Sequence, residues 1–176
     1  MNTRHLLLLA SLALTMPLAA QTPQEDFKRD ITLSGSNYVA YRGPQKQLTP
    51  APKGYKPFYL SHYGRHGSRY MIGKQAYDVP YFSLLKAKQK GKLTAKGEET
   101  LEKVKMIREE ARGREGELTP LGALQHQGIT RRMMERFPEI FAGNTNIEAR
   151  STTVIRCILS MENGLQQMLR MNPKLH

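Results

Sequence analysis

A short basic stretch, YLSHYGRHGSRY at residues 59–70, combines residue types that bind and attack phosphate. Arg65 and Arg69 carry planar, permanently charged guanidinium groups that match phosphate oxygens two at a time. His66 lies between them, and a neutral imidazole held against a clamped phosphate can attack phosphorus and form a phosphohistidine. Two glycines in the stretch allow a tight turn and the close approach of a ligand. The pattern predicts an anion pocket with a nucleophile, and a basic surface turn is the alternative.

The segments around this stretch indicate an α/β protein. Residues 58–63 begin with the apolar run Phe-Tyr-Leu and predict a short strand that the glycine at position 64 ends. Residues 146–150 predict a second strand. Strands separated by helices are typical of α/β sheets, in which ligands bind where a strand ends and a helix begins. The basic stretch follows the first strand and would lie at such a position.

Two helices are expected between the basic stretch and residue 117. Residues 77–89 predict a short helix. A clearer one follows, because apolar residues recur at helical spacing from Leu101 to Ala111. The glycines at positions 113 and 116 are expected to end it.

Two further helices have recognisable boundaries. Thr119 can cap a helix that starts at Pro120, where the missing N–H had no partner in any case, and this helix runs to about Arg136. A cap at Ser151 or Thr152 predicts the start of the last helix. The proline at position 173 closes that helix.

Three motifs, taken together, resemble those of the histidine acid phosphatases. They are Arg-His-Gly-x-Arg at residues 65–69, Leu-Thr-x-x-Gly-x-x-Gln at 118–125, and Arg-Ser-Thr-x-x-x-Arg at 150–156. They occur in the family's order and at compatible separations, and the matching segments cover most of the chain after Tyr59. The start of the chain and the basic stretch are most similar to the multiple inositol polyphosphate phosphatase branch.

The resemblance implies a phosphoglycerate mutase-like α/β fold, in which helices flank a central sheet and a helical insertion spans about 77–117. The residue pattern predicts a signal peptide over residues 1–20, and a composition rich in Pro, Gly, Gln and Thr predicts an extended N-terminal segment over residues 21–56. Residues 57–176 would then be the N-terminal part of a histidine phosphatase domain whose sheet is incomplete at the C-terminal end.

The resemblance also implies roles residue by residue. His66 matches the family's nucleophile, and Arg65 and Arg69 match two of its phosphate-binding arginines. Arg156 matches the third arginine of the clamp. With the predicted cap, Arg156 would lie in the opening turn of its helix, where the helix N-terminus favours an anion. Arg150 ends the second predicted strand and is expected to have a structural or supporting role.

Two departures from the family pattern are visible. Met71 stands where the family usually has proline, which loosens the turn but removes no chemistry. The family's proton donor belongs to a His-Asp or His-Ala-Glu motif far toward the C-terminus, and no stretch here matches it. General acid catalysis typically contributes about 10²–10⁴-fold. The chain is therefore expected to be the N-terminal part of a longer enzyme and to be impaired by itself.

The expected function is that of an exported phosphomonoesterase that hydrolyses inositol polyphosphates, phytate among them, through a phosphohistidine intermediate. No cofactor and no metal are expected, and the partner is a small phosphorylated substrate rather than nucleic acid. One alternative is a histidine acid phosphatase of broad substrate range. Another is a non-enzymatic protein that uses the same arginines only to hold phosphate or another polyanion.

The first twenty residues have the pattern of a secretory signal, with an apolar run from Leu6 to Leu14 and small residues before position 21. They predict a periplasmic or secreted protein with no stable membrane insertion after cleavage, because the run is too short to span a bilayer. Cleavage removes Arg4 and lowers the net charge from +12 to +11, a balance that attracts polyanions. Cys157 is the single cysteine and is expected to be a small buried hydrophobe.

The remaining histidines and the tyrosines have alternative interpretations. His62 and His66 are four residues apart, which on a helix would indicate a metal site, but the glycines oppose a helix there and no carboxylate lies between them. His126 follows Gln125 on an amphipathic helix and is expected to pack or to face solvent. The tyrosines of the basic stretch could stack on bases, yet no nucleic-acid-binding motif accompanies them.

Overall fold

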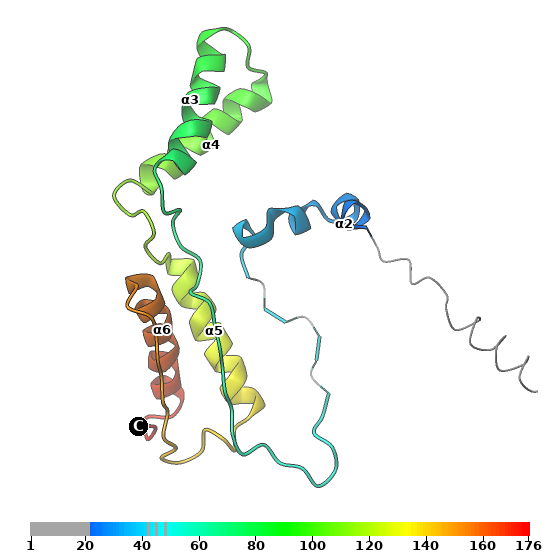
Figure 1. Ribbon diagram of the computed structural model, residues 1–176, viewed down its shortest axis with the longest axis vertical. Helices are drawn as coiled ribbons and strands as arrows, with labels where there is room; N and C mark the ends of the chain where they lie inside the picture. Colours follow the sequence, from blue (N-terminus) through cyan, green and yellow to red (C-terminus); the bar gives the residue numbers. More distant parts are fainter. Residues whose placement is uncertain (1–21, 42, 45, 48) are drawn as a thin grey trace, which may run out of the picture. The chain divides into compact units, whose positions relative to one another are not determined.

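The computed structural model describes residues 22–41, 43–44, 46–47 and 49–176. The predicted signal peptide, residues 1–20, lies outside the described residues. The chain divides into two compact units, one up to Ala40 and one from Tyr41 onward. Their helices, labelled in Figure 1 except for the 3-10 helix η1, are α2 (Pro23–Arg29), η1 (Ile31–Tyr38), α3 (Gln75–Gln89), α4 (Ala95–Glu110), α5 (Pro120–Arg136) and α6 (Ile155–Met171).

The prediction of an α/β fold with a phosphoglycerate mutase-like sheet is wrong. Neither residues 58–63 nor residues 146–150 form a strand, and the only β pairing among the described residues is an isolated bridge between Arg69 and Leu118. A strand is stable when a neighbouring strand supplies partners for its N–H and C=O groups. The described residues offer no such neighbour to residues 58–63, so Phe58 stays 94% exposed.

The first unit contains helix in a stretch that was expected to be extended. Helix α2 begins with a capping box, in which Thr22 Oγ1 accepts from Glu25 N and Glu25 Oε2 accepts from Thr22 N. Pro23 occupies the first helical position. Asp30 ends the helix, and its side chain then accepts hydrogen bonds from the N–H and hydroxyl of Thr32 at the start of η1. These short-range caps explain why this part of residues 21–56 is helical.

Helices α3 and α4 confirm the two helices expected before residue 117, and they pack against each other. Arg108 on α4 joins them: its Nε donates to Asp78 Oδ1 at 2.6 Å, and its guanidinium lies 4.9 Å from the centre of the Tyr81 ring. Leu101 is only 3% exposed, and Ala111, at the end of α4, is 1% exposed. The residues expected to form a helical insertion therefore form a helical pair.

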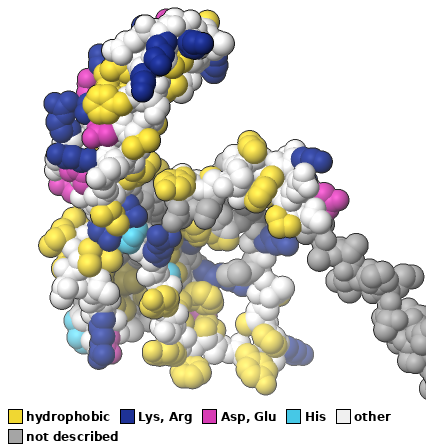
Figure 2. Space-filling model, turned by 45° about the horizontal axis from the view of Figure 1, so that its top comes forward, with side chains coloured by type: hydrophobic (Ala, Val, Ile, Leu, Met, Phe, Trp, Pro, Cys, Tyr) yellow, Lys and Arg dark blue, Asp and Glu magenta, His cyan; other side chains and the backbone are white. Residues whose placement is uncertain are grey.

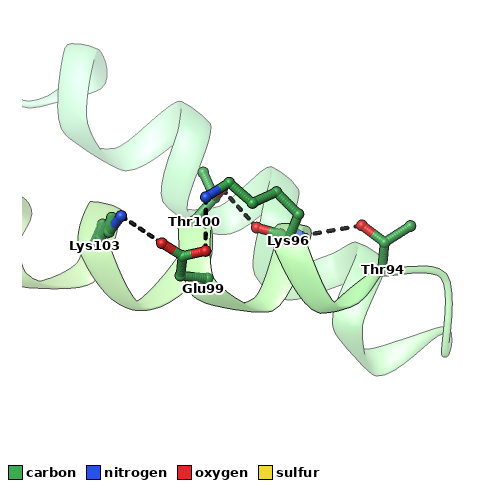
Figure 3. A network of polar contacts seen from close by, with 6 residues as sticks. Thr94, Lys96, Glu99, Thr100 and Lys103 are labelled. Atoms are coloured by element: carbon green, nitrogen blue, oxygen red, sulfur yellow. Dashed lines mark hydrogen bonds and ion pairs between the residues drawn. The ribbon is translucent and has the colours of Figure 1, made fainter.

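The first turns of α4 are stabilised by a local polar network (Figure 3). Thr94 Oγ1 caps the helix by accepting from Gly97 N at 3.2 Å. Glu99 accepts from Lys103 at 2.5 Å and from Lys96 at 2.7 Å, and these two ammonium groups, Lys103 first, lower the pKa of Glu99. Because these side chains are solvent-exposed, the network stabilises the helix only slightly. Figure 2 shows Lys and Arg side chains over this part of the surface.

Helices α5 and α6 form the other packed pair (Figure 1). Helix α5 starts at Pro120 with Thr119 as its cap and ends at Arg136, as predicted. Close to the middle of the pair, a Cβ atom on Gly164 would lie 3.1 Å from Thr130 Oγ1, so a small residue is needed at this crossing. Gln127 Nε2 on α5 donates to Asn163 Oδ1 on α6 at 3.0 Å.

A small hydrophobic core closes the end of this pair. Its buried members are Met134, Phe141 and Leu175, and partly buried residues that include Leu60 and Ile147 pack against them. One residue of each predicted strand thus packs, partly buried, against this core, and the two segments do not pair with each other as strands. No helix in the described ranges is both long and apolar enough to cross a membrane.

Candidate functional site

The basic stretch forms a loop that touches helix α5 backbone to backbone. A Cβ atom on Gly67 would lie 2.4 Å from the carbonyl oxygen of Gly122, and one on Gly122 would lie 2.2 Å from the carbonyl oxygen of Ser68. Neither position accepts a side chain without movement of the backbone. The first two sequence motifs therefore meet at a contact that only glycine permits.

Hydrogen bonds from the start of α5 hold the same loop. Thr119 donates to the carbonyl oxygen of Ser68 from both its backbone N and its Oγ1, each at 2.9 Å. Ser68 N in turn donates to Gln125 Oε1 at 2.8 Å. Thr119 also caps α5 by accepting from Gly122 N at 3.1 Å. One threonine therefore starts the helix and fixes the loop.

Helix α6, which begins within the third motif, also holds the loop by a hydrogen bond. Gly67 N donates to Ser160 Oγ at 3.1 Å, and Ser160 Oγ donates to the carbonyl oxygen of Arg156 at 2.7 Å. Ser160 is 3% exposed. Its hydroxyl thus connects the residue that follows His66 to the helical turn that carries Arg156.

His66 is half-buried, and its ring nitrogen Nδ1 lies 2.8 Å from the carbonyl oxygen of Gly67. Because a carbonyl only accepts, Nδ1 carries the proton in this contact. In the neutral ring the nitrogen with the free lone pair is then Nε2. An attack by His66 would therefore proceed from Nε2.

Arg69 and Arg156 come from different motifs, and their side chains donate to two backbone segments that are hydrogen-bonded to each other. Tyr70 N donates to the carbonyl oxygen of Glu117, and Gly116 N donates to that of Met71, which joins the loop to residues 116–118. Arg69 Nη1 donates to the carbonyl oxygen of Tyr70 at 2.8 Å. Arg156 Nη1 donates to that of Gly116 at 3.4 Å.

Three buried side-chain nitrogens in the described part of the chain lack a hydrogen-bond partner, and all three belong to the motif residues. They are Arg69 Nε, Arg156 Nε and Gln125 Nε2. Leaving a buried donor unpaired costs about 1–3 kcal/mol, and more for a charged group. An anion would supply the acceptors that the two guanidinium groups lack. Arg65, by contrast, is exposed.

The start of α6 differs from the prediction of a cap at Ser151 or Thr152. The helix begins at Ile155, and Val154 occupies the cap position without a side-chain hydrogen bond. Ser151 Oγ donates instead to the carbonyl oxygen of Thr152, so it cannot cap at that site. Arg156 nevertheless lies in the first turn.

Arg150 has a different environment from Arg156. It is paired with Glu148, its Nε lying 2.8 Å from Glu148 Oε1, and both side chains are largely exposed. The guanidinium of Arg150 therefore already has a carboxylate partner in solvent, whereas Arg156 is half-buried with Nε unpaired.

Sequence reasoning gave no role to Ser160, Thr119, Gln125 or His126 in holding the loop. The signal that could have found Ser160 is its position one helical turn after Arg156. His126 was expected to pack or face solvent, but its half-buried ring reaches the loop, with Nε2 3.1 Å from the carbonyl oxygen of Arg65. Burial lowers the pKa of His126, its hydrogen bond to Arg65 opposes this, and the nearby His62 and His66 lower it further.

Two other features of the described residues do not coincide with this site. A mainly apolar hollow of about 400 Å³ lies between residues 57–62 and the end of α5, and none of the motif arginines lines it. Its apolar walls do not suit a phosphate. No group of three or more His, Cys, Asp and Glu side chains in the described ranges could hold a metal ion.

Comparison with solved structures supports a histidine acid phosphatase-like fold for this chain. One similar structure is the crystal structure of the Bifidobacterium longum multiple inositol polyphosphate phosphatase in complex with inositol hexasulfate. The sequence identity is 27%, the TM-score is 0.58, and the similarity covers 77% of this chain. The chain spans 29% of the length of that protein. No protein-family model and no curated protein matches the sequence.

Proposed function

We propose that this chain carries the phosphate-binding and nucleophilic part of a phosphomonoesterase that acts on inositol polyphosphates through a phosphohistidine at His66. The observation that carries the proposal is that Arg69 and Arg156 both lie where two hydrogen-bonded backbone segments meet. These arginines come from separate motifs and donate to the carbonyl oxygens of Tyr70 and Gly116, which belong to two backbone segments that are hydrogen-bonded to each other. Each arginine also leaves a buried Nε without an acceptor. His66 lies three residues from Arg69 on the same loop.

In the proposed reaction, Nε2 of His66 attacks the phosphorus of the bound ester. The N–P bond forms, the bond from phosphorus to the ester oxygen breaks, and the leaving oxygen takes up a proton. The arginines stabilise the negative charge on the three equatorial phosphate oxygens. Water then attacks the phosphohistidine and releases inorganic phosphate, which restores the imidazole. The chain's residues are assigned to binding and attack, and none is assigned to protonation of the leaving group.

Three observations favour inositol polyphosphates as substrates. The net charge, +12 for the full sequence and +11 without residues 1–20, attracts polyanions, and Arg65 is exposed, so its guanidinium is accessible to a phosphate. The similar Bifidobacterium protein is a multiple inositol polyphosphate phosphatase whose structure contains inositol hexasulfate, in which sulfates stand for phosphates. Export to the periplasm or medium belongs to the same proposal and is supported by the pattern of residues 1–20.

Rapid-quench labelling tests the proposal. The purified chain is mixed with a ³²P-labelled aryl phosphate, whose leaving group needs little protonation, and quenched in base to preserve phosphohistidine. We expect an acid-labile phosphoenzyme in the wild type, none in His66→Ala, and undiminished labelling in His62→Ala, which removes the neighbouring exposed histidine. Phosphate binding without any phosphoenzyme in the wild type would instead favour the non-enzymatic anion-binding alternative.

A further inference from the structure

Among the residues that the structure describes, His126 makes the one hydrogen bond to Arg65. The His126 Nε2 atom lies 3.1 Å from the carbonyl oxygen of Arg65, and the carbonyl can only accept, so Nε2 carries the proton. This carbonyl belongs to the peptide that joins Arg65 to His66. The imidazole of His126 therefore fixes the backbone immediately before the proposed nucleophile.

Together with two other side chains, His126 holds the loop by hydrogen bonds to the backbone before and after His66. The adjacent residue, Gln125, accepts from Ser68 N through Oε1, and Ser160 on α6 accepts from Gly67 N. The peptides after His66 are thus held by Gln125 and Ser160, and the peptide before it is held by His126. Loss of His126 would leave the segment from Arg65 to His66 unsupported.

We infer that His126 is a positioning residue, whose Nε2–H holds the Arg65 carbonyl and thereby aims the Arg65 guanidinium and the His66 ring at a bound phosphate. The inference rests on the proposed function for its catalytic consequence, although the loop contact itself does not. The half-buried position of the ring supports it, because the residues packed around the imidazole restrict the orientations that it can take. The lowered pKa of His126 is consistent with a ring that stays neutral in this place.

The test separates the hydrogen bond from simple packing. His126→Leu introduces an apolar side chain of similar size and removes the donor. His126→Gln keeps an N–H close to the position of Nε2. Gln127→Ala is the matched control, because it removes a hydrogen bond between α5 and α6 without touching the loop. Each variant of the full chain is compared with the wild type by amide hydrogen exchange over residues 64–69 and by the rate of phosphoenzyme formation.

We expect His126→Leu to speed exchange in residues 64–69 by several-fold to about tenfold and to slow phosphoenzyme formation by about 10- to 100-fold. His126→Gln should restore both to within about threefold of the wild type, and Gln127→Ala should leave the loop exchange unchanged. Equal exchange and equal labelling in His126→Leu and Gln127→Ala would overturn the inference, as would failure of His126→Gln to rescue. If even the wild type forms no phosphoenzyme, the proposed function fails, while the exchange comparison still decides whether His126 positions the loop.

Discussion

The backbones of Gly67 and Gly122 are in direct contact, so that a Cβ atom on Gly67 would lie 2.4 Å from Gly122 O and 2.7 Å from Gly122 Cα. One glycine lies in the loop that carries His66, and the other lies in the first turn of α5. Their contact is what allows Thr119 and Gln125 to reach Ser68, because both hydrogen bonds require the loop to lie against the helix.

Gly122→Ala should push the loop away from α5. Its methyl group would lie 2.2 Å from Ser68 O, which is backbone and cannot rotate aside, so we expect a loss of about 1–3 kcal/mol in the free energy of unfolding. Urea denaturation measures this loss. Gly128→Ala on the same helix is the control: its methyl meets only the flexible end of Arg132, at 3.3 Å, and should leave stability unchanged or raise it slightly. Equal effects of the two substitutions would contradict the backbone contact.

Ser160→Ala should destabilise the protein through the loop rather than through α6. The substitution leaves the buried N–H of Gly67 without an acceptor, which costs about 1–3 kcal/mol. Chemical denaturation gives the change in stability, and faster amide exchange at Gly67 would locate it. Ser83→Ala, at an exposed position of α3, should change stability by less than about 0.5 kcal/mol. A Ser160→Ala protein as stable as Ser83→Ala would show that the hydroxyl contributes nothing.

Arg156→Lys should weaken phosphate binding although it keeps the charge. Lysine lacks the planar fork that holds two oxygens, and a charge-assisted hydrogen bond contributes about 1.5–3 kcal/mol, so we expect at least about a tenfold rise in the Kd for inorganic phosphate. Isothermal titration calorimetry at constant ionic strength measures it. The matched substitution Arg150→Lys affects a guanidinium already paired with Glu148 in solvent and should change the Kd by less than about twofold. A larger effect at Arg150 would reverse the assignment of the third arginine.

Stability should fall on acidification partly because of His126. Burial lowers the pKa of this imidazole in the folded chain, so the unfolded chain binds the proton more readily. The contribution of His126 is therefore fully present above its unfolded pKa of about 6.5 and is lost as the pH falls through the lower folded value. Urea midpoints measured from pH 8 to pH 5 should decline less steeply in His126→Gln than in the wild type. Gln127→Ala, which removes no titrating group, should keep the wild-type slope; identical slopes in all three proteins would contradict the role given to His126.

Signals that act within a few residues predicted most of the helices. Thr119 and Pro120 mark the start of α5, and the proline after Asn172 marks the end of α6, because caps and ring constraints depend only on neighbouring backbone groups. The capping box of Thr22 and Glu25 is a local signal of the same kind, and it indicates a helix within residues 21–56, which the prediction of an extended segment did not include. Local reasoning failed at Ser151, whose hydroxyl bonds to the next residue instead of capping a helix.

The sequence by itself determined most of the helical segments, the order of the three motifs and the residue types that can bind and attack phosphate, because each depends on residues close together in the chain. The tertiary structure alone decided that residues 58–63 and 146–150 form no sheet, since strands depend on partners that may come from anywhere in the chain. It alone brought the Ser160 hydroxyl to Gly67 N, 93 positions away in the chain, and the His126 ring to the carbonyl oxygen of Arg65, 61 positions away. Such contacts follow from how helices pack, and no local pattern of residues specifies them.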